Sequence, residues 1–100
     1  MTNNQVLSLL GLARRARQIE TGEGTVLKAI RKGKSQLVFL ASDAGAATAK
    51  ELTDKCNYYH VALVRQFTAS ELSDAIGMTR KIISVNQAGF ANKMKKIMRI

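Results

Sequence analysis

Residues 21–44 read TGEGTVLKAIRKGKSQLVFLASDA, and this stretch contains the strongest structural signals in the chain. Its first half predicts a helix that runs to about Lys32 and ends at Gly33, with four apolar side chains facing inward: Val26, Leu27, Ala29 and Ile30. Its second half contains Leu37–Ala41, a short and wholly apolar run that is typical of a strand covered on both faces. Such a strand needs a layer of helices on each side, so this stretch predicts a sheet between two helical layers.

The rest of the chain repeats this alternation of helix and strand. Val61–Val64 is a further short apolar run that we predict to be a strand, and we predict another strand at Ile82–Val85. Apolar side chains at helical spacing predict helices before, between and after the strands: Val6, Leu9, Leu10 and Ala13; Ala49, Leu52 and Cys56; Leu72, Ala75 and Ile76; and Phe90, Met94, Ile97 and Met98. We therefore expect an α/β fold in which residues 1–100 form one domain around a mixed sheet.

Polar residues at the predicted helix starts indicate how these helices begin. Asn3 or Asn4 is expected to cap the first helix, and Asp43 can cap the helix that follows the 37–41 strand. Thr68, followed three residues later by Glu71, has the pattern of a capping box, and Gly77 is expected to end that helix.

The composition excludes several classes of protein. A single cysteine, Cys56, excludes an internal disulfide framework and suits the reducing cytoplasm, which is the expected location. The longest apolar run is Leu37–Ala41, far shorter than the ~18 residues that a membrane helix needs. No basic residue precedes the first apolar stretch, so we expect neither a secretory signal nor a membrane partner.

Signals of catalysis, metal binding and nucleotide binding are weak. Cys56 and His60 are only two potential metal ligands, and a zinc site needs at least three. The sequence Gly33-Lys34-Ser35 resembles the end of a phosphate loop, but Lys28 stands where that loop needs its first glycine. We therefore predict a protein that is not an enzyme and that has no catalytic residues, no metal and no cofactor.

Basic residues gather in two segments of the chain. The 16 lysine and arginine residues against 7 acidic ones give a formal net charge of +9. Residues 14–34 carry a net +5 and residues 80–100 a net +6, whereas residues 35–79 carry a net −2. A fold that brings both basic segments to one side forms a surface for a polyanion such as nucleic acid. The alternative is an ordinary basic protein with solvated helix faces.

The segment Thr21–Thr25 precedes or opens the helix that runs to Lys32. A helix N-terminus presents unpaired N–H groups and partial positive charge, and the two glycines of this segment let a phosphate approach the backbone closely. Lys28 follows one turn later, and we expect Thr25, Lys28 and Lys32 to share one face. This arrangement predicts a basic helix end that can lie in a nucleic-acid groove. The alternative is that the glycines form only a strand-to-helix turn.

Two motifs carry a resemblance to a known family: Thr21-Gly22-(x5)-Lys28-Ala29-Ile30-Arg31-(x)-Gly33-Lys34 and Leu37-Val38-(x)-Leu40-Ala41-(x)-Asp43-Ala44. They resemble the kink-turn RNA-binding ribosomal-protein family, the L7Ae/L30e group, and the overall pattern is most similar to its bacterial YlxQ-like branch. Later matches extend the resemblance over nearly the whole chain: Lys50, Leu52 and Cys56; Glu71-Leu72; Ala75-Ile76-Gly77; and Gly89-Phe90-Ala91. The resemblance implies a three-layer α-β-α sandwich with a four-stranded mixed sheet, and it adds a short first strand near Gln18–Glu20.

The resemblance also implies a function, the binding of RNA where tandem sheared G·A pairs kink the duplex. It places the first set of RNA contacts on the helix that begins near residue 22: Gly22, Glu23, Gly24, Thr25, Lys28, Arg31 and Lys32. A loop after the third strand is implied to pack against the extruded nucleotides: Gln66, Phe67, Thr68, Ala69 and Ser70. The implied partners are ribosomal or other structured RNA and the ribosome or its proteins, and the protein is expected to be a monomer.

This chain departs from the family pattern at two positions that read bases. The family commonly has Asn or Lys where Gly24 stands, and Glu or Gln where Thr25 stands. Loss of one good base contact typically costs ~1–3 kcal/mol of discrimination. We therefore predict weak selectivity for a standard kink-turn, with binding that is either mostly phosphate-driven or directed at a different structured RNA.

A function of another class remains open, because a fold does not by itself determine a function. In that alternative, the chain is a protein-interaction module that uses the acidic 43–55 stretch or its last helix, and its RNA binding is vestigial. Partner binding that survives the replacement of Lys28 by alanine would distinguish this alternative from RNA binding.

Overall fold

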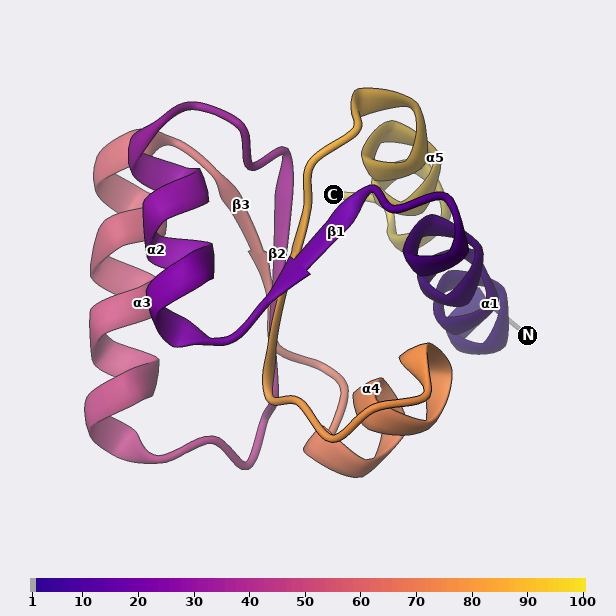
Figure 1. Cartoon of the computed structure of the whole chain (residues 1–100), viewed down its shortest axis with the longest axis horizontal. Helices are drawn as coiled ribbons and strands as arrows, with labels where there is room; N and C mark the ends of the chain where they lie inside the picture. The colour runs from indigo at the N-terminus through magenta and orange to yellow at the C-terminus, as the bar shows by residue number, and fades with distance from the viewer. Residues whose placement is uncertain (1) are drawn as a thin grey trace.

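The structure is a computed structural model that describes residues 2–100. Within these described residues, five helices and four strands follow one another: α1 (Thr2–Arg15), β1 (Ile19–Thr21), α2 (Glu23–Arg31), β2 (Leu37–Leu40), α3 (Ala46–Tyr59), β3 (Ala62–Val64), α4 (Ala69–Ile76), β4 (Ile82–Val85) and α5 (Ala88–Met98). The sheet lies in the middle, with α2 and α3 on one face and α1, α4 and α5 on the other (Figure 1). The predicted three-layer α-β-α sandwich is therefore confirmed.

The sheet is mixed, as the sequence indicated, and its strand order is β1-β4-β2-β3. β2 pairs with β3 in parallel, whereas β4 pairs antiparallel with both β1 and β2. The two central strands, β2 and β4, are buried along their whole length. This confirms that the 37–41 run is a strand covered on both faces, and the predicted strand at Ile82–Val85 is present as well. The first strand expected near Gln18–Glu20 is present one residue later, at Ile19–Thr21.

Two hydrophobic cores hold the layers together. Side chains alternate along β2, so Leu37 and Phe39 face the core under α1, α4 and α5, whereas Val38 and Leu40 face the core under α2 and α3. The second core is filled by three of the four predicted inward residues of α2, Val26, Leu27 and Ile30, and by Leu52 and Cys56 of α3. The fourth predicted residue, Ala29, is buried as well. None of the helices within residues 2–100 is both long enough and apolar enough to cross a membrane.

The predicted capping box at the start of α4 is confirmed. The Thr68 side chain accepts a hydrogen bond from the Glu71 N–H at 3.1 Å, and the Glu71 carboxylate accepts one from the Thr68 N–H at 2.9 Å. Gly77 ends the helix in the left-handed conformation at φ 74°, which a residue without Cβ adopts readily.

Two other predicted caps are wrong. α1 begins at Thr2, so Asn3 and Asn4 lie inside the helix rather than before it. The residue that caps α3 is Gly45, whereas Asp43 Oδ1 accepts a hydrogen bond from the Ala69 N–H at 2.9 Å. Asp43 therefore caps α4, because the fold brings the loop after β2 against the start of a helix 26 residues further along the chain.

Replacement of Asp43 by alanine should lower the free energy of unfolding by about 1 kcal/mol, as for other lost N-terminal caps. The reason is that the Ala69 N–H loses its acceptor at the uncompensated end of α4. Urea unfolding measures the change, and Asp43→Asn is the matched control because its amide oxygen still accepts the bond. Equal stability of Asp43→Ala and the wild type would show that water replaces this cap without cost.

Candidate nucleic-acid interface

The first turn of α2 has no side-chain cap. Its N-cap residue is Gly22, which is held in the left-handed region at φ 91° and has no side chain to accept a hydrogen bond. The Gly22 N–H itself donates to Ile82 O at 3.2 Å, which ties the turn to β4. The N–H groups that follow have no acceptor within the helix and give this end a partial positive charge. A Cβ at Gly24 would meet no heavy atom within 4 Å, so the backbone there is open to a ligand.

Lysine side chains line a hollow along one side of α2. The hollow has a volume of about 420 Å³, and its lining comes from β1, α2 and the residues after α2: Glu20, Gly24, Thr25, Lys28, Ala29, Lys32 and Lys34. The predicted common face of Thr25, Lys28 and Lys32 is thus confirmed. We call this feature the lysine hollow. Three ammonium groups beside an uncapped helix N-terminus can attract phosphates and donate hydrogen bonds.

Two other residues of the predicted site point toward α3 instead. Thr48 Oγ1 donates to Glu23 Oε1 at 3.3 Å. The pKa of the Glu51 carboxyl is raised above its ordinary value, mainly because it shares a hydrogen bond with Glu23, while Lys55 and Arg31 oppose that rise. Glu23 and Arg31 therefore lie on the α3 side of α2, outside the lysine hollow.

The second predicted RNA contact, the loop of residues 66–70 after β3, is less accessible to a ligand than the predicted contacts on α2. The side chain of Phe67 is 2% exposed and packs against Phe39 at a ring-centroid distance of 6.0 Å. The ring therefore faces the core, in contrast to the prediction that it packs against nucleotides. Thr68 and Ala69 are engaged in capping α4, and Ser70 is exposed. Contact of these three residues with RNA stays a prediction.

A different loop lies directly beside the start of α2. It joins α4 to β4, and Arg80 Nε donates to Thr21 Oγ1 at 3.0 Å. A hollow of about 430 Å³ is shared between this loop, the start of α2 and the β2–α3 connection: Gly22, Glu23, Ala44, Gly45, Thr48, Thr79, Arg80, Lys81 and Ile82. Our sequence analysis did not include Thr79–Lys81 in the site. The signal that could have pointed to them is the basic pair Arg80-Lys81 directly before a buried strand.

The two basic segments come together only in part. Arg80 and Lys81 join the start of α2, but α5 packs on the opposite face of the sheet (Figure 1). The lysines of α5 therefore lie in the other helical layer from the lysine hollow. The basic surface that the fold assembles is formed by α2 and the α4–β4 loop.

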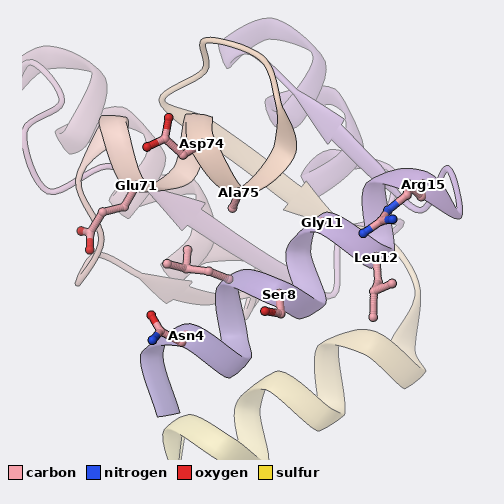
Figure 2. A pocket seen from close by; sticks show the side chains of 9 residues that line it. Asn4, Ser8, Gly11, Leu12, Arg15, Glu71, Asp74 and Ala75 are labelled. Atoms are coloured by element: carbon pink, nitrogen blue, oxygen red, sulfur yellow. The ribbon is translucent and has the colours of Figure 1, made fainter. Parts of the chain in front are cut away.

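The groove between α1 and α4 is larger than both hollows beside α2, at about 610 Å³. The two helices that form it approach closely at Gly11, where a Cβ would lie 2.9 Å from Ala75 O. Figure 2 shows the Glu71 and Asp74 carboxylates on one side of this groove and Arg15 on the other. Two acids against one cation do not suit a polyanion, so the lysine hollow remains the better candidate for nucleic acid.

Cys56 has the chemistry of a core residue. It is 1% exposed, and burial raises the pKa of its thiol to about 11, so the thiolate needed for nucleophilic or metal chemistry is disfavoured. His60 ends α3 in the left-handed conformation at φ 59°. Residues 2–100 contain no group of three or more His, Cys, Asp or Glu side chains that could hold a metal ion.

Sequence comparison identifies the family to which this geometry belongs. Residues 4–97 match the model of the ribosomal protein L7Ae/L30e/S12e/Gadd45 family. The chain belongs to this L7Ae family. It is 43% identical over 95 residues to the RNA-binding protein YlxQ of Bacillus subtilis (strain 168), which covers 94% of this chain and 95% of that relative. It is 38% identical over 93 residues to the protein of the same name from Enterococcus faecium, covering 93% and 90%. The chain is thus a member of the YlxQ-like branch of the L7Ae family.

Solved structures show the same L7Ae-family fold. A protein of unknown function from Bacillus halodurans C is 45% identical and superposes with a TM-score of 0.90, covering 95% of this chain and 97% of that one. The 15.5kD RNA binding protein of Giardia lamblia superposes with a TM-score of 0.81 over 96% of this chain and 89% of its own. Because the identity to the Giardia protein is 20%, that likeness shows the fold alone.

Proposed function

We propose that this chain is a non-catalytic protein that binds structured RNA, with a kink-turn as its target, and that it acts on the ribosome or its RNA. The observation that carries the proposal is the uncapped start of α2 beside the lysine hollow. Membership of the L7Ae family and two relatives named RNA-binding protein YlxQ support it. In this proposal, residues 1–100 form one RNA-binding domain that acts in the cytoplasm as a monomer.

The geometry fits a kinked duplex better than a regular one. An ordinary RNA duplex hides the acceptor edges of its bases in a deep, narrow major groove, whereas a kink opens that groove. Guanine then offers O6 and N7, which the Lys28 ammonium can reach as a donor. The free N–H groups at the start of α2 and the ammonium groups of Lys32 and Lys34 suit the flanking phosphates.

Selectivity in this proposal depends on few groups. Gly24 offers only its N–H, and Thr25 offers a short hydroxyl, so neither supplies a long base-reading side chain. The Arg80 guanidinium lies beside Gly22 and can donate further hydrogen bonds to an RNA bound at the start of α2. Discrimination between RNAs is therefore expected to depend mainly on Lys28, with Arg80 as a second source.

The experiment that tests this function compares two RNA hairpins at one fixed, near-physiological salt concentration. One contains a kink-turn, and the other has both sheared G·A pairs changed to Watson–Crick pairs. We expect at least tenfold tighter binding of the kinked hairpin, about 1.4 kcal/mol. Equal and salt-sensitive affinities would show a basic surface that does not read the kink. No binding to either hairpin would favour a protein-binding function.

A second candidate function is protein binding, and the groove between α1 and α4 is the observation that favours it. Leu12 is 48% exposed at this groove, and the carboxylates of Glu71 and Asp74 lie along its α4 side. An apolar floor beside two acids suits an amphipathic segment that carries lysine or arginine. Such binding would survive Lys28→Ala and would be lost on the charge reversal Asp74→Lys.

A further inference from the structure

The lysine hollow contains one acidic side chain, Glu20 of β1. Glu20 is half-buried and lies opposite Ser84 of β4 in the sheet, on the face that α2 covers. A carboxylate in this position repels the phosphates that the neighbouring lysines attract. Glu20 therefore weakens binding to any polyanion unless its carboxylate itself forms a favourable contact with the ligand.

A chain of hydrogen bonds from uncharged side chains holds the Glu20 carboxylate in place. Asn86 Nδ2 donates to Glu20 Oε1 at 2.6 Å, and Asn86 Oδ1 accepts from Ser84 Oγ at 2.6 Å. The Ser84 and Ser35 hydroxyl oxygens lie 2.7 Å apart in the protein interior. Because each hydroxyl has one proton, these bonds are all satisfied when Ser35 donates to Ser84, Ser84 to Asn86 and Asn86 to Glu20. Donors aligned in one direction strengthen one another toward the carboxylate.

The lysines of the hollow do not neutralise Glu20. Within residues 2–100 the one ion pair is that of Lys50 and Asp54 on α3, at 2.7 Å, so no lysine nitrogen of the hollow lies within ion-pair distance of Glu20. In the same part of the chain, Asn86 is the one hydrogen-bond partner of the carboxylate. The second carboxylate oxygen therefore remains available to a ligand, and the ammonium groups remain available to phosphates.

We propose that Glu20 is a specificity-determining residue of the RNA site. Its fixed carboxylate accepts a hydrogen bond from a donor group of the RNA, either an exocyclic amino group or a 2′-hydroxyl, and it keeps phosphates out of this part of the hollow. A plain duplex presents phosphates to the hollow and is repelled by Glu20, whereas an opened groove can present a donor. This inference rests on the proposed function and assigns part of its selectivity to one residue.

The test measures Glu20→Gln and the wild type on the kinked and the Watson–Crick hairpin. Glutamine keeps the shape and removes the charge, so we expect the affinity for the plain hairpin to rise about threefold and that for the kinked hairpin to stay level or fall. The preference for kinked RNA should therefore drop at least threefold. Asp54→Asn is the matched control, because it changes the net charge equally at an exposed site outside both hollows beside α2.

A second variant removes the hydrogen bond that positions the Glu20 carboxylate and leaves the charge unchanged. Asn86→Ala keeps the Glu20 carboxylate but removes the donor that holds it, so we expect about threefold weaker binding of the kinked hairpin and unchanged binding of the plain one. Thermal unfolding checks that the variant is folded.

A kinked hairpin with 2′-deoxy nucleotides at the kink distinguishes the two donors. If the donor is a 2′-hydroxyl, the wild type binds this deoxy-substituted hairpin more weakly than the all-RNA hairpin, whereas Glu20→Gln binds both equally. If the donor is an exocyclic amino group, the wild type binds the two hairpins equally.

The outcomes separate this inference from the proposed function. Equal gains of Glu20→Gln on both hairpins, or a kink preference that Glu20→Gln and Asn86→Ala both keep, would overturn the role of Glu20 and leave the proposed function standing. Equal wild-type affinity for the two hairpins would overturn the proposed kink preference, and the role of Glu20 with it.

Discussion

Replacement of Lys28 by alanine is expected to weaken binding of the kinked hairpin at least tenfold and binding of the plain hairpin only about twofold. On the plain duplex, Lys28 can contribute only one phosphate contact among several. On the kinked RNA its ammonium also donates to base acceptors, and one such contact is worth ~1–3 kcal/mol of discrimination. The backbone at Gly24 and the short Thr25 side chain cannot replace that contact, so the whole loss appears in the measured affinity.

The matched control for this prediction is Lys95→Ala. Lys95 belongs to α5, which lies on the opposite face of the sheet from α2 (Figure 1), so its loss should change both affinities slightly and equally. A salt titration adds a second reading, because each neutralised phosphate contributes about −0.9 to the slope of log affinity against log salt on duplex DNA, which serves here as a guide. Equal losses of Lys28→Ala on both hairpins would rule out a base-reading role for Lys28.

The central part of the candidate site could be predicted because it is local in sequence. Residues 21–34 contain the turn, the helix and the lysines, and helical periodicity alone places Thr25, Lys28 and Lys32 on one face. The contribution of Arg80 could not be predicted in this way. Its guanidinium reaches Thr21 across 59 residues of sequence, through the antiparallel pairing of β1 with β4.

The same limit applies to Glu20 and Asp43. The bond between Glu20 and Asn86 joins residues 66 positions apart, and it exists because β1 is the edge strand next to β4. Asp43 has the sequence pattern of a cap for the next helix, yet it caps α4, because a loop elsewhere in the fold leaves the Ala69 N–H within reach. Sequence patterns indicate which groups can form hydrogen bonds, whereas the topology decides which partner they find.

The fold itself was predictable where short runs of mostly apolar residues form the central strands. β2 and β4 are buried on both faces, and the apolar residues within 37–41 and 82–85 indicated their positions to within one residue. β1 has three half-buried residues, Ile19–Thr21, and too few positions to show a periodicity of its own. Only the family resemblance indicated it, and that indication was one residue early.

Replacement of Phe67 by alanine should lower the free energy of unfolding by about 3–5 kcal/mol, the usual cost of removing a buried aromatic ring. The ring is packed against Phe39 in the core under α1, α4 and α5, and alanine would leave a cavity there. The Phe67 carbonyl also accepts a hydrogen bond from the Ser42 N–H at 2.8 Å, so this residue joins the loops before α3 and α4. Urea unfolding followed by circular dichroism measures the loss.

Phe67→Leu distinguishes a core role from a role in RNA contact. Leucine keeps most of the apolar volume, so this variant should lose about 1–2 kcal/mol of stability and stay folded at room temperature. Because a side chain that is 2% exposed cannot stack on a nucleotide, its affinities for the kinked and the plain hairpin should equal those of the wild type. A folded Phe67→Leu protein that bound the kinked hairpin several-fold more weakly, with the plain hairpin unaffected, would show that the ring leaves the core to contact RNA, as the family resemblance implied.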